Sequence, residues 1–250
     1  MEIPAPQQIY VIYFTPRSGS SRVTEIASAT GTLGSPQECF HPRQVPRLAA
    51  RNGARSLDEY VQAAMRERAP GGVFGCEVNA VMIEQTFGGA AQFMKYFRDA
   101  PCFWLIRKDI VAQAVSLAKM VKTKVSHAPL STEEERAAAD SVFEYDPENI
   151  RHWLYHLREM EVTCEKIFAR FGVSPTRLSY ERLSGMADLH IAQLIARNIG
   201  VAEPHALPLV PKHTKIGTAR NIEFADRFEA EHPRLMARLA RERATILESC

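Results

Sequence analysis

Two short stretches of the chain are apolar at every position. Residues 9–14 read IYVIYF and residues 102–106 read CFWLI. A strand that is covered by helices on both sides of its sheet must be apolar on both faces, so each run predicts a buried strand of a parallel β-sheet. Residues 73–78 are a third candidate strand, and a short fourth lies near residues 177–179.

Segments with apolar residues three and four positions apart separate these runs, which is the spacing of amphipathic helices. The predicted helices cover residues 21–30, 57–65, 81–87, 90–98, 110–118, 147–171, 187–198 and 222–247. Strands that alternate with helices indicate an α/β fold, with a mainly parallel β-sheet flanked by helices. We expect a single domain over residues 1–250.

Composition and charge exclude several classes of protein. The 31 basic and 29 acidic side chains leave a net charge of +2, which does not favour a nucleic-acid partner. None of the five cysteines forms a CxxC pair, so neither a zinc site nor a disulfide framework is indicated. The sequence shows no leader pattern and no apolar run near the ~18 residues of a membrane span. We expect a cytoplasmic protein without a transmembrane segment.

The turn TPRSGSS, residues 15–21, follows the first predicted strand and precedes a predicted helix. The carboxyl end of a parallel strand and the free N–H groups of a helix N-terminus together favour an anion site. Gly19 allows close approach of the backbone, and Arg17 supplies a fixed positive charge. Hydroxyl donors come from Ser18, Ser20 and Ser21. An ordinary small-residue turn would have the same composition, so both interpretations stay open for the turn alone.

A second polar segment begins with Arg107, at the end of the second confident strand. Asp109, Gln113 and Ser116 follow at helical spacing and form one polar stripe on an otherwise apolar helix. Buried polar groups need hydrogen-bond partners, so the stripe beside Arg107 suggests a second anion site. A helix cap with hydrogen bonds between helices is the other explanation.

Together the two segments resemble those of sulfotransferases. Strand–TPRSGSS–helix is similar to their 5′-phosphosulfate loop, and IRKD followed by QAVS is similar to their 3′-phosphate segment. The spacing of the motifs and their residues are most similar to those of the bacterial trehalose 2-sulfotransferase family. Further matches are PQECF at residues 36–40, YDP at 145–147 and SYERL at 179–183. The resemblance extends from the first strand to about residue 231.

The resemblance implies a sulfotransferase fold and a donor, 3′-phosphoadenosine 5′-phosphosulfate (PAPS), which leaves as 3′-phosphoadenosine 5′-phosphate (PAP). It implies no metal, and it is compatible with a homodimer. The 3′-phosphate is expected on Arg107 and on either Ser116 or Gln113. Lys212 and Lys215 would close over the nucleotide, or lie in a solvated loop. The 5′ end of the donor is expected on Pro16, Arg17, Ser18, Gly19, Ser20 and Ser21.

Sulfuryl transfer is an in-line displacement in which charge builds on the leaving phosphate oxygen, and Arg17 is suitably placed to stabilise it. The resemblance implies Glu38 as the general base, with neighbouring His41 as the reserve candidate. Arg22, Cys39 and the segment KTKVSH at residues 122–127 depart from the family pattern. We therefore expect a sugar or glycolipid acceptor and do not assign trehalose.

Two other functions use the same features. The first is a nucleotide-dependent small-molecule or sugar kinase, which the absence of GxxxxGK[ST] and of a recognisable acidic magnesium pair opposes. The second is a carbohydrate-binding or scaffold protein without activity. The polar residues retained in both phosphate segments oppose this interpretation.

Overall fold

The computed structural model describes residues 4–125, 132–208 and 218–250, so Lys212 and Lys215 lie outside the described residues. The chain forms two compact units. One contains Met1–Thr15, Gly19–Ile106 and Met160–Val210; the other contains Pro16–Ser18, Arg107–Glu159 and Pro211–Cys250. We call them the sheet unit and the helical unit. The prediction of one domain over residues 1–250 stays a prediction.

The helices and strands follow one another along the chain in the alternation that the apolar pattern predicts. They are β1 (Gln8–Phe14), α1 (Ser20–Ala29), α2 (Val45–Asn52), α3 (Leu57–Glu67), η1 (Pro70–Gly72), β2 (Val73–Val78), α4 (Ala80–Phe87), α5 (Ala90–Phe97), β3 (Cys102–Ile106), α6 (Ile110–Thr123), α7 (Glu133–Val142), α8 (Pro147–Phe171), β4 (Thr176–Ser179), α9 (Tyr180–Ser184), α10 (Asp188–Ile199), α11 (Ala219–Glu231) and α12 (Pro233–Glu248).

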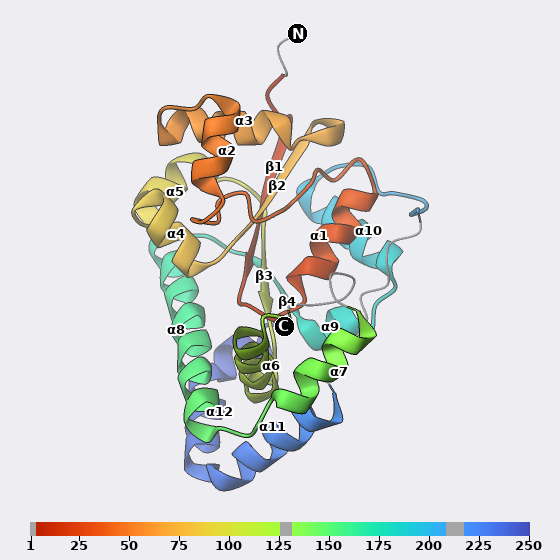
Figure 1. Cartoon of the computed structure of the whole chain (residues 1–250). Coiled ribbons are helices and arrows are strands. Elements are labelled where there is room, and N and C mark those ends of the chain that lie inside the picture. The colour runs from red at the N-terminus through yellow and green to blue at the C-terminus, as the bar shows by residue number, and fades with distance from the viewer. Residues whose placement is uncertain (1–3, 126–131, 209–217) are drawn as a thin grey trace. The chain divides into compact units, whose positions relative to one another are not determined.

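The sheet unit is built on four parallel strands in the order β2-β1-β3-β4. Figure 1 shows β1 and β2 side by side. β2 and β3 have the predicted bounds, and β1 begins one residue earlier than predicted. Every residue of β2 and β3 is buried, because helices cover both faces of the sheet.

Alternate residues of β1 point to opposite faces of the sheet. Ile12 and Phe14 pack in one core with residues of α1 and α10. Tyr13 points the other way, with its ring edge-on to Phe93 of α5 and to Phe168 near the end of α8, at centroid distances of 6.1 and 4.9 Å. Edge-to-face contacts of this kind add to the burial of apolar area. The sheet is therefore a rigid base for the loops at its carboxyl edge.

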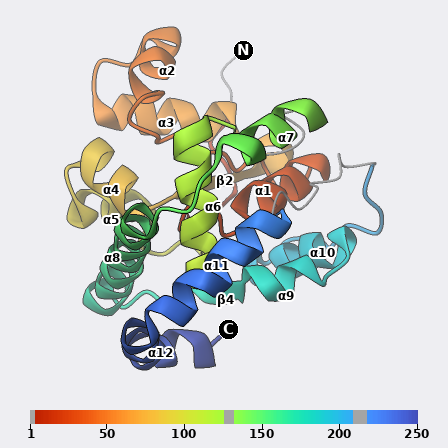
Figure 2. The same ribbon diagram turned by 60° about the horizontal axis from the view of Figure 1, so that its bottom comes forward.

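The helical unit is organised around α6. α11 packs against α6 and runs obliquely past it in Figure 2, and α7 also packs against α6. Its apolar core takes residues from α6, α11, α12 and the first part of α8, together with Phe143. Asp109 caps α6 by accepting a hydrogen bond from the Ala112 N–H at 2.8 Å. The prediction of a buried helix after Arg107 is confirmed, although Asp109 itself is exposed.

The structure corrects the prediction of one long last helix. α11 ends at Glu231 and α12 begins at Pro233, because proline has no N–H for a continued helix but fits its first turn. Among the residues that the structure describes, no helix has the length and apolarity that crossing a bilayer requires.

Candidate active site

The loop after β1 has an unusual backbone. Arg17 and Gly19 both have positive φ, 68° and 84°, and only one other non-glycine residue among those described does so. A side chain at position 19 would also come within 2.9 Å of the Tyr180 ring, so only glycine fits. Strained backbone in a loop is a pointer to function, and left-handed residues in such a turn make anion-binding concavities.

One side-chain group beside this backbone lacks a hydrogen-bond partner among the described residues. The Ser18 hydroxyl is fully buried and makes no hydrogen bond. Gly19, the N-cap of α1, provides no side chain to accept from the first-turn N–H groups. A buried hydroxyl without a partner is costly, and a bound anion would satisfy it. The loop therefore has the chemistry of a phosphate site.

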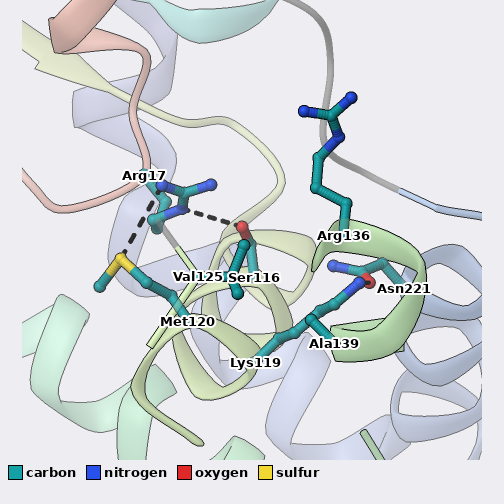
Figure 3. Close-up of a pocket in the computed structure, with 8 residues that line it drawn as sticks. All are labelled: Arg17, Ser116, Lys119, Met120, Val125, Arg136, Ala139 and Asn221. Atoms are coloured by element: carbon teal, nitrogen blue, oxygen red, sulfur yellow. Dashed lines mark hydrogen bonds between the residues drawn. The ribbon is translucent and has the colours of Figure 1, made fainter. Parts of the chain in front are cut away.

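Arg17 reaches the second polar segment. Its Nε donates to Ser116 Oγ at 3.0 Å and its Nη1 lies 3.9 Å from Met120 Sδ. Gln113, fully buried, donates from Nε2 to the Pro16 carbonyl at 2.7 Å. The helical unit thus brings Arg17 and Ser116 together, as Figure 3 shows, while one Gln113 donor bonds the loop backbone. Whether Ser116 or Gln113 meets the 3′-phosphate stays a prediction.

A small cavity opens beside Arg17 in the helical unit. Three of its residues are cations, namely Arg17, Lys119 and Arg136. Lys119 is 6% exposed and donates to Asp140 at 2.7 Å. Burial opposes ionisation of Asp140, but its hydrogen bonds from Lys119 and Thr218 prevail and lower its pKa. Sequence reasoning missed Lys119, although it lies one helical turn after Ser116.

Glu38 lies in the sheet unit, on a segment tied to β2. Gln37 forms a parallel bridge with Cys76, and the Glu77 N–H donates to the Gln37 carbonyl at 3.2 Å. Phe40 anchors the other end of the segment among the rings of α3, α4 and α5. Burial raises the pKa of the half-buried Glu38 carboxyl. The segment therefore presents a carboxylate that is more basic than an exposed glutamate.

His41 is tied to the same segment, since its N–H donates to the Glu38 carbonyl at 3.0 Å. Its Nδ1 accepts from the Arg43 N–H at 3.2 Å. Burial, and then the charge of Arg43, lower the pKa of His41, so its neutral form is favoured. Glu38 and His41 are therefore both candidates for the general base.

Comparison with known proteins shows which family this chain belongs to. A sequence profile described as Stf0 sulphotransferase matches residues 9–231. The chain belongs to the Stf0 sulphotransferase family. Trehalose 2-sulfotransferase of Mycobacterium tuberculosis is 25% identical, over 90% of this chain and 96% of that protein. The crystal structure of a sulfotransferase from Alicyclobacillus acidocaldarius covers 90% of this chain and 95% of its own, with a TM-score of 0.52 and 16% identity.

Membership in the Stf0 family confirms the resemblance inferred from the loop and the 3′-phosphate segment, and the solved structure confirms the sulfotransferase fold. The match covers Arg17, Glu38, Arg107 and Ser116 but tests no residue's role. In the described ranges, no three His, Cys, Asp or Glu side chains gather in a way that could hold a metal ion. A metal-free reaction stays a prediction.

Arg243 lies beyond the Stf0 match, yet it supports the backbone at Arg107. It is 3% exposed, and its guanidinium donates to the carbonyls of Arg107 and Lys108 at 2.6 and 2.7 Å. These bonds fix the backbone from which the Arg107 side chain departs. Sequence reasoning missed this residue because one arginine in a densely charged helix carries no signal of burial.

Replacing Arg243 by methionine should lower the free energy of unfolding by about 2–4 kcal/mol, because two charge-assisted hydrogen bonds are lost. It should also weaken PAP binding, since Arg107 loses its support. Urea unfolding and calorimetric titration with PAP measure the two effects. Arg241→Met, at an exposed position of the same helix, is the matched control. Lower stability with unchanged PAP affinity would show that Arg243 does not position Arg107.

Proposed function

We propose that this protein transfers a sulfuryl group from PAPS to a hydroxyl of a carbohydrate or glycolipid acceptor, by in-line displacement. Glu38 is the general base, and Arg17 stabilises the charge that develops on the leaving phosphate. The loop at residues 15–21 takes the 5′ end of the donor. Arg107, with Ser116 or Gln113, takes its 3′-phosphate.

One observation carries the donor assignment, namely the hydrogen bond between Arg17 and Ser116 at 3.0 Å. It joins the loop expected at the 5′ end to the helix expected at the 3′ end, 99 residues further along the chain. A ligand with phosphates at both ends of one nucleotide would use both segments. Neither ATP nor a simple sugar phosphate has a 3′-phosphate for the second segment.

The residues present fit an anionic donor. Ser18 offers a buried hydroxyl with no hydrogen bond in the described part of the chain, and the positive φ angles of Arg17 and Gly19 suit a backbone that curves around an anion. Lys119 and Arg136 add positive charge to the cavity beside Arg17. Bound PAPS would supply the activated sulfuryl group and a stable leaving phosphate. The protein's part is to hold the donor, offset its charge and remove the acceptor proton.

The candidate base and a relative of known name both support a sugar acceptor. A carboxylate with a raised pKa suits removal of a proton from a hydroxyl. The 25% identical relative is named a trehalose 2-sulfotransferase, which supports a sugar acceptor. Two residues that depart from the family pattern serve the fold here. Arg22 bonds Asp188 at 2.6 Å, and Cys39 is 1% exposed.

Thermal unfolding with nucleotides tests the donor. PAP should stabilise the protein, by about 2.7 kcal/mol at a concentration one hundred times its Kd, because it binds only the folded state. ATP with magnesium should give no comparable shift. A shift with ATP and magnesium alone would indicate a kinase instead. No shift with either would favour a carbohydrate-binding protein without transfer activity.

Incubation with radiolabelled PAPS tests transfer itself. Disaccharides, glycolipids and lipopolysaccharide are the acceptors to compare, and we expect label in at least one sugar-containing product. Cleavage of the donor without any labelled product in the presence of all three classes would contradict the carbohydrate assignment.

A further inference from the structure

A second carboxyl group lies at the carboxyl end of β2, where ligands bind in parallel α/β sheets. Glu77 is 3% exposed, and its backbone pairs with Ile12 of β1. Its carboxyl group is hydrogen-bonded by the side chain of Ser20, the first residue of α1. An acidic side chain is rarely buried so completely, and no cation of the described residues is among the causes that shift the pKa of Glu77. The transfer mechanism described above does not use it.

Glu77 is coupled to the base through the backbone as well as through charge. The Glu77 N–H donates to the Gln37 carbonyl, and Gln37 directly precedes Glu38. The charge of Glu38 acts on the Glu77 carboxyl. Within the described part of the chain, the other titratable groups that interact with Glu77 are Tyr10 from β1, Cys76 from β2 and Cys39 from the segment of Glu38. Glu77 thus lies between the base and the first turn of α1.

The two carboxyl groups lose their protons in a defined order. Burial first, and then the charge of Glu38, raise the pKa of Glu77 to about 8, although the hydrogen bond from Ser20 opposes this. For Glu38, burial alone raises the pKa, because Glu77 still carries its proton while Glu38 ionises. At neutral pH Glu77 therefore keeps its proton beside Glu38.

We propose that Glu77 is a positioning residue for sulfuryl transfer, whose neutral acid form keeps the donor loop and the base free of a second negative charge. The proposal rests on the proposed function. When Glu77 releases its proton to solvent, a carboxylate faces Ser20 of the anion-binding loop and Glu38 at once. The loop then repels the anionic donor, and donor binding weakens.

The pH dependence of the KM for PAPS tests the role. At about pH 9, roughly one tenth of the molecules would retain the Glu77 proton, so the wild-type KM should be ~10-fold higher than at pH 7. Glu77→Gln keeps the shape and the Ser20 contact but cannot ionise, and its KM should change less than about twofold over this range. Glu84→Gln, at an exposed position of α4, is the control and should behave as wild type. Equal KM ratios in wild type and Glu77→Gln would overturn the proposal.

A second measurement does not need activity. In the folded protein Glu77 holds its proton up to a pKa of about 8, whereas an unfolded glutamate releases it near the ordinary value of 4.5. The folded state therefore binds more protons in this window, and its stability falls as pH rises through it. Melting temperatures of wild type should fall relative to Glu77→Gln between pH 5 and about pH 9, by several degrees.

The two measurements separate the possible failures. Absence of transfer with the expected melting difference would reject the proposed function and leave the buried acid in place. Parallel melting curves across the pH range would show that Glu77 is ionised in the folded state and would reject the proposal, whatever the activity. Glu38→Gln should narrow the melting difference, because the charge of Glu38 is then absent; an unchanged difference would reject the coupling of the two carboxyl groups.

Discussion

Arg17→Ala should abolish sulfuryl transfer, with a loss of at least ~10³-fold in kcat, while the protein still folds. Removing one preorganised donor to a developing oxyanion costs about 10²–10³-fold, and Arg17 carries a full charge in addition. Its Nε already donates to Ser116 Oγ, so the guanidinium is held beside the segment proposed to bind the 3′-phosphate. Turnover of labelled PAPS and the circular dichroism melt of each variant measure the two effects.

The control for Arg17→Ala must separate the effect of losing the positive charge from the effect of backbone strain. Arg17 has a φ of 68°, and alanine would be strained there as well. Arg17→Gly relieves the strain and also removes the charge, so it should lose turnover as completely as Arg17→Ala. Arg17→Lys keeps a charge but loses the fork geometry, and it should retain a partial rate. Near-normal turnover in Arg17→Gly would remove Arg17 from the mechanism.

Glu38→Gln should lower kcat by about 10²–10⁴-fold and change the KM for PAPS much less, because a general base acts on the acceptor and not on the donor. Burial raises the pKa of Glu38, so wild-type kcat should rise with pH through a range above that of an ordinary glutamate. The rising limb should vanish in the variant. Steady-state kinetics across the acidic pH range measure both effects.

His41→Asn is the matched variant for the base. If Glu38 is the base, His41→Asn should keep the rising limb and most of the turnover. Unchanged turnover in Glu38→Gln together with loss in His41→Asn would assign the base to His41. Retention in both variants would leave water as the proton acceptor.

The strands could be predicted from sequence more fully than the helices. Residues 73–78 and 102–106 match their strands because both faces are buried, and burial on both faces makes a strand mostly apolar, with Glu77 as the one charged residue of the two. α2 and α7 gave no periodic signal because each buries one residue, Leu48 and Ala139 respectively. The last helices were predicted as one because their apolar period continues across Pro233, and only the missing N–H of proline interrupts it.

Some features of the candidate site could also be predicted from the sequence, and others could not. The loop at residues 15–21 could be predicted as an anion site because glycine, serine and arginine between a strand and a helix form a local sequence pattern. The contact of Arg17 with Ser116 joins positions 99 residues apart, and the sequence marks each separately without joining them. Glu77 was missed because in the sequence it looks like the polar end of a strand. The role proposed for it depends on its burial and on Glu38, which only the folded chain brings near it.

The attachment of the Glu38 segment to β2 also affects solubility. β2 stands at the end of the strand order, and an edge strand that nothing covers offers unpaired backbone groups to strands of other molecules. Gln37 occupies part of that edge through its bridge to Cys76. The same few residues thus present the candidate base and protect the sheet from self-association. Variants that loosen this segment should aggregate more readily as well as turn over more slowly.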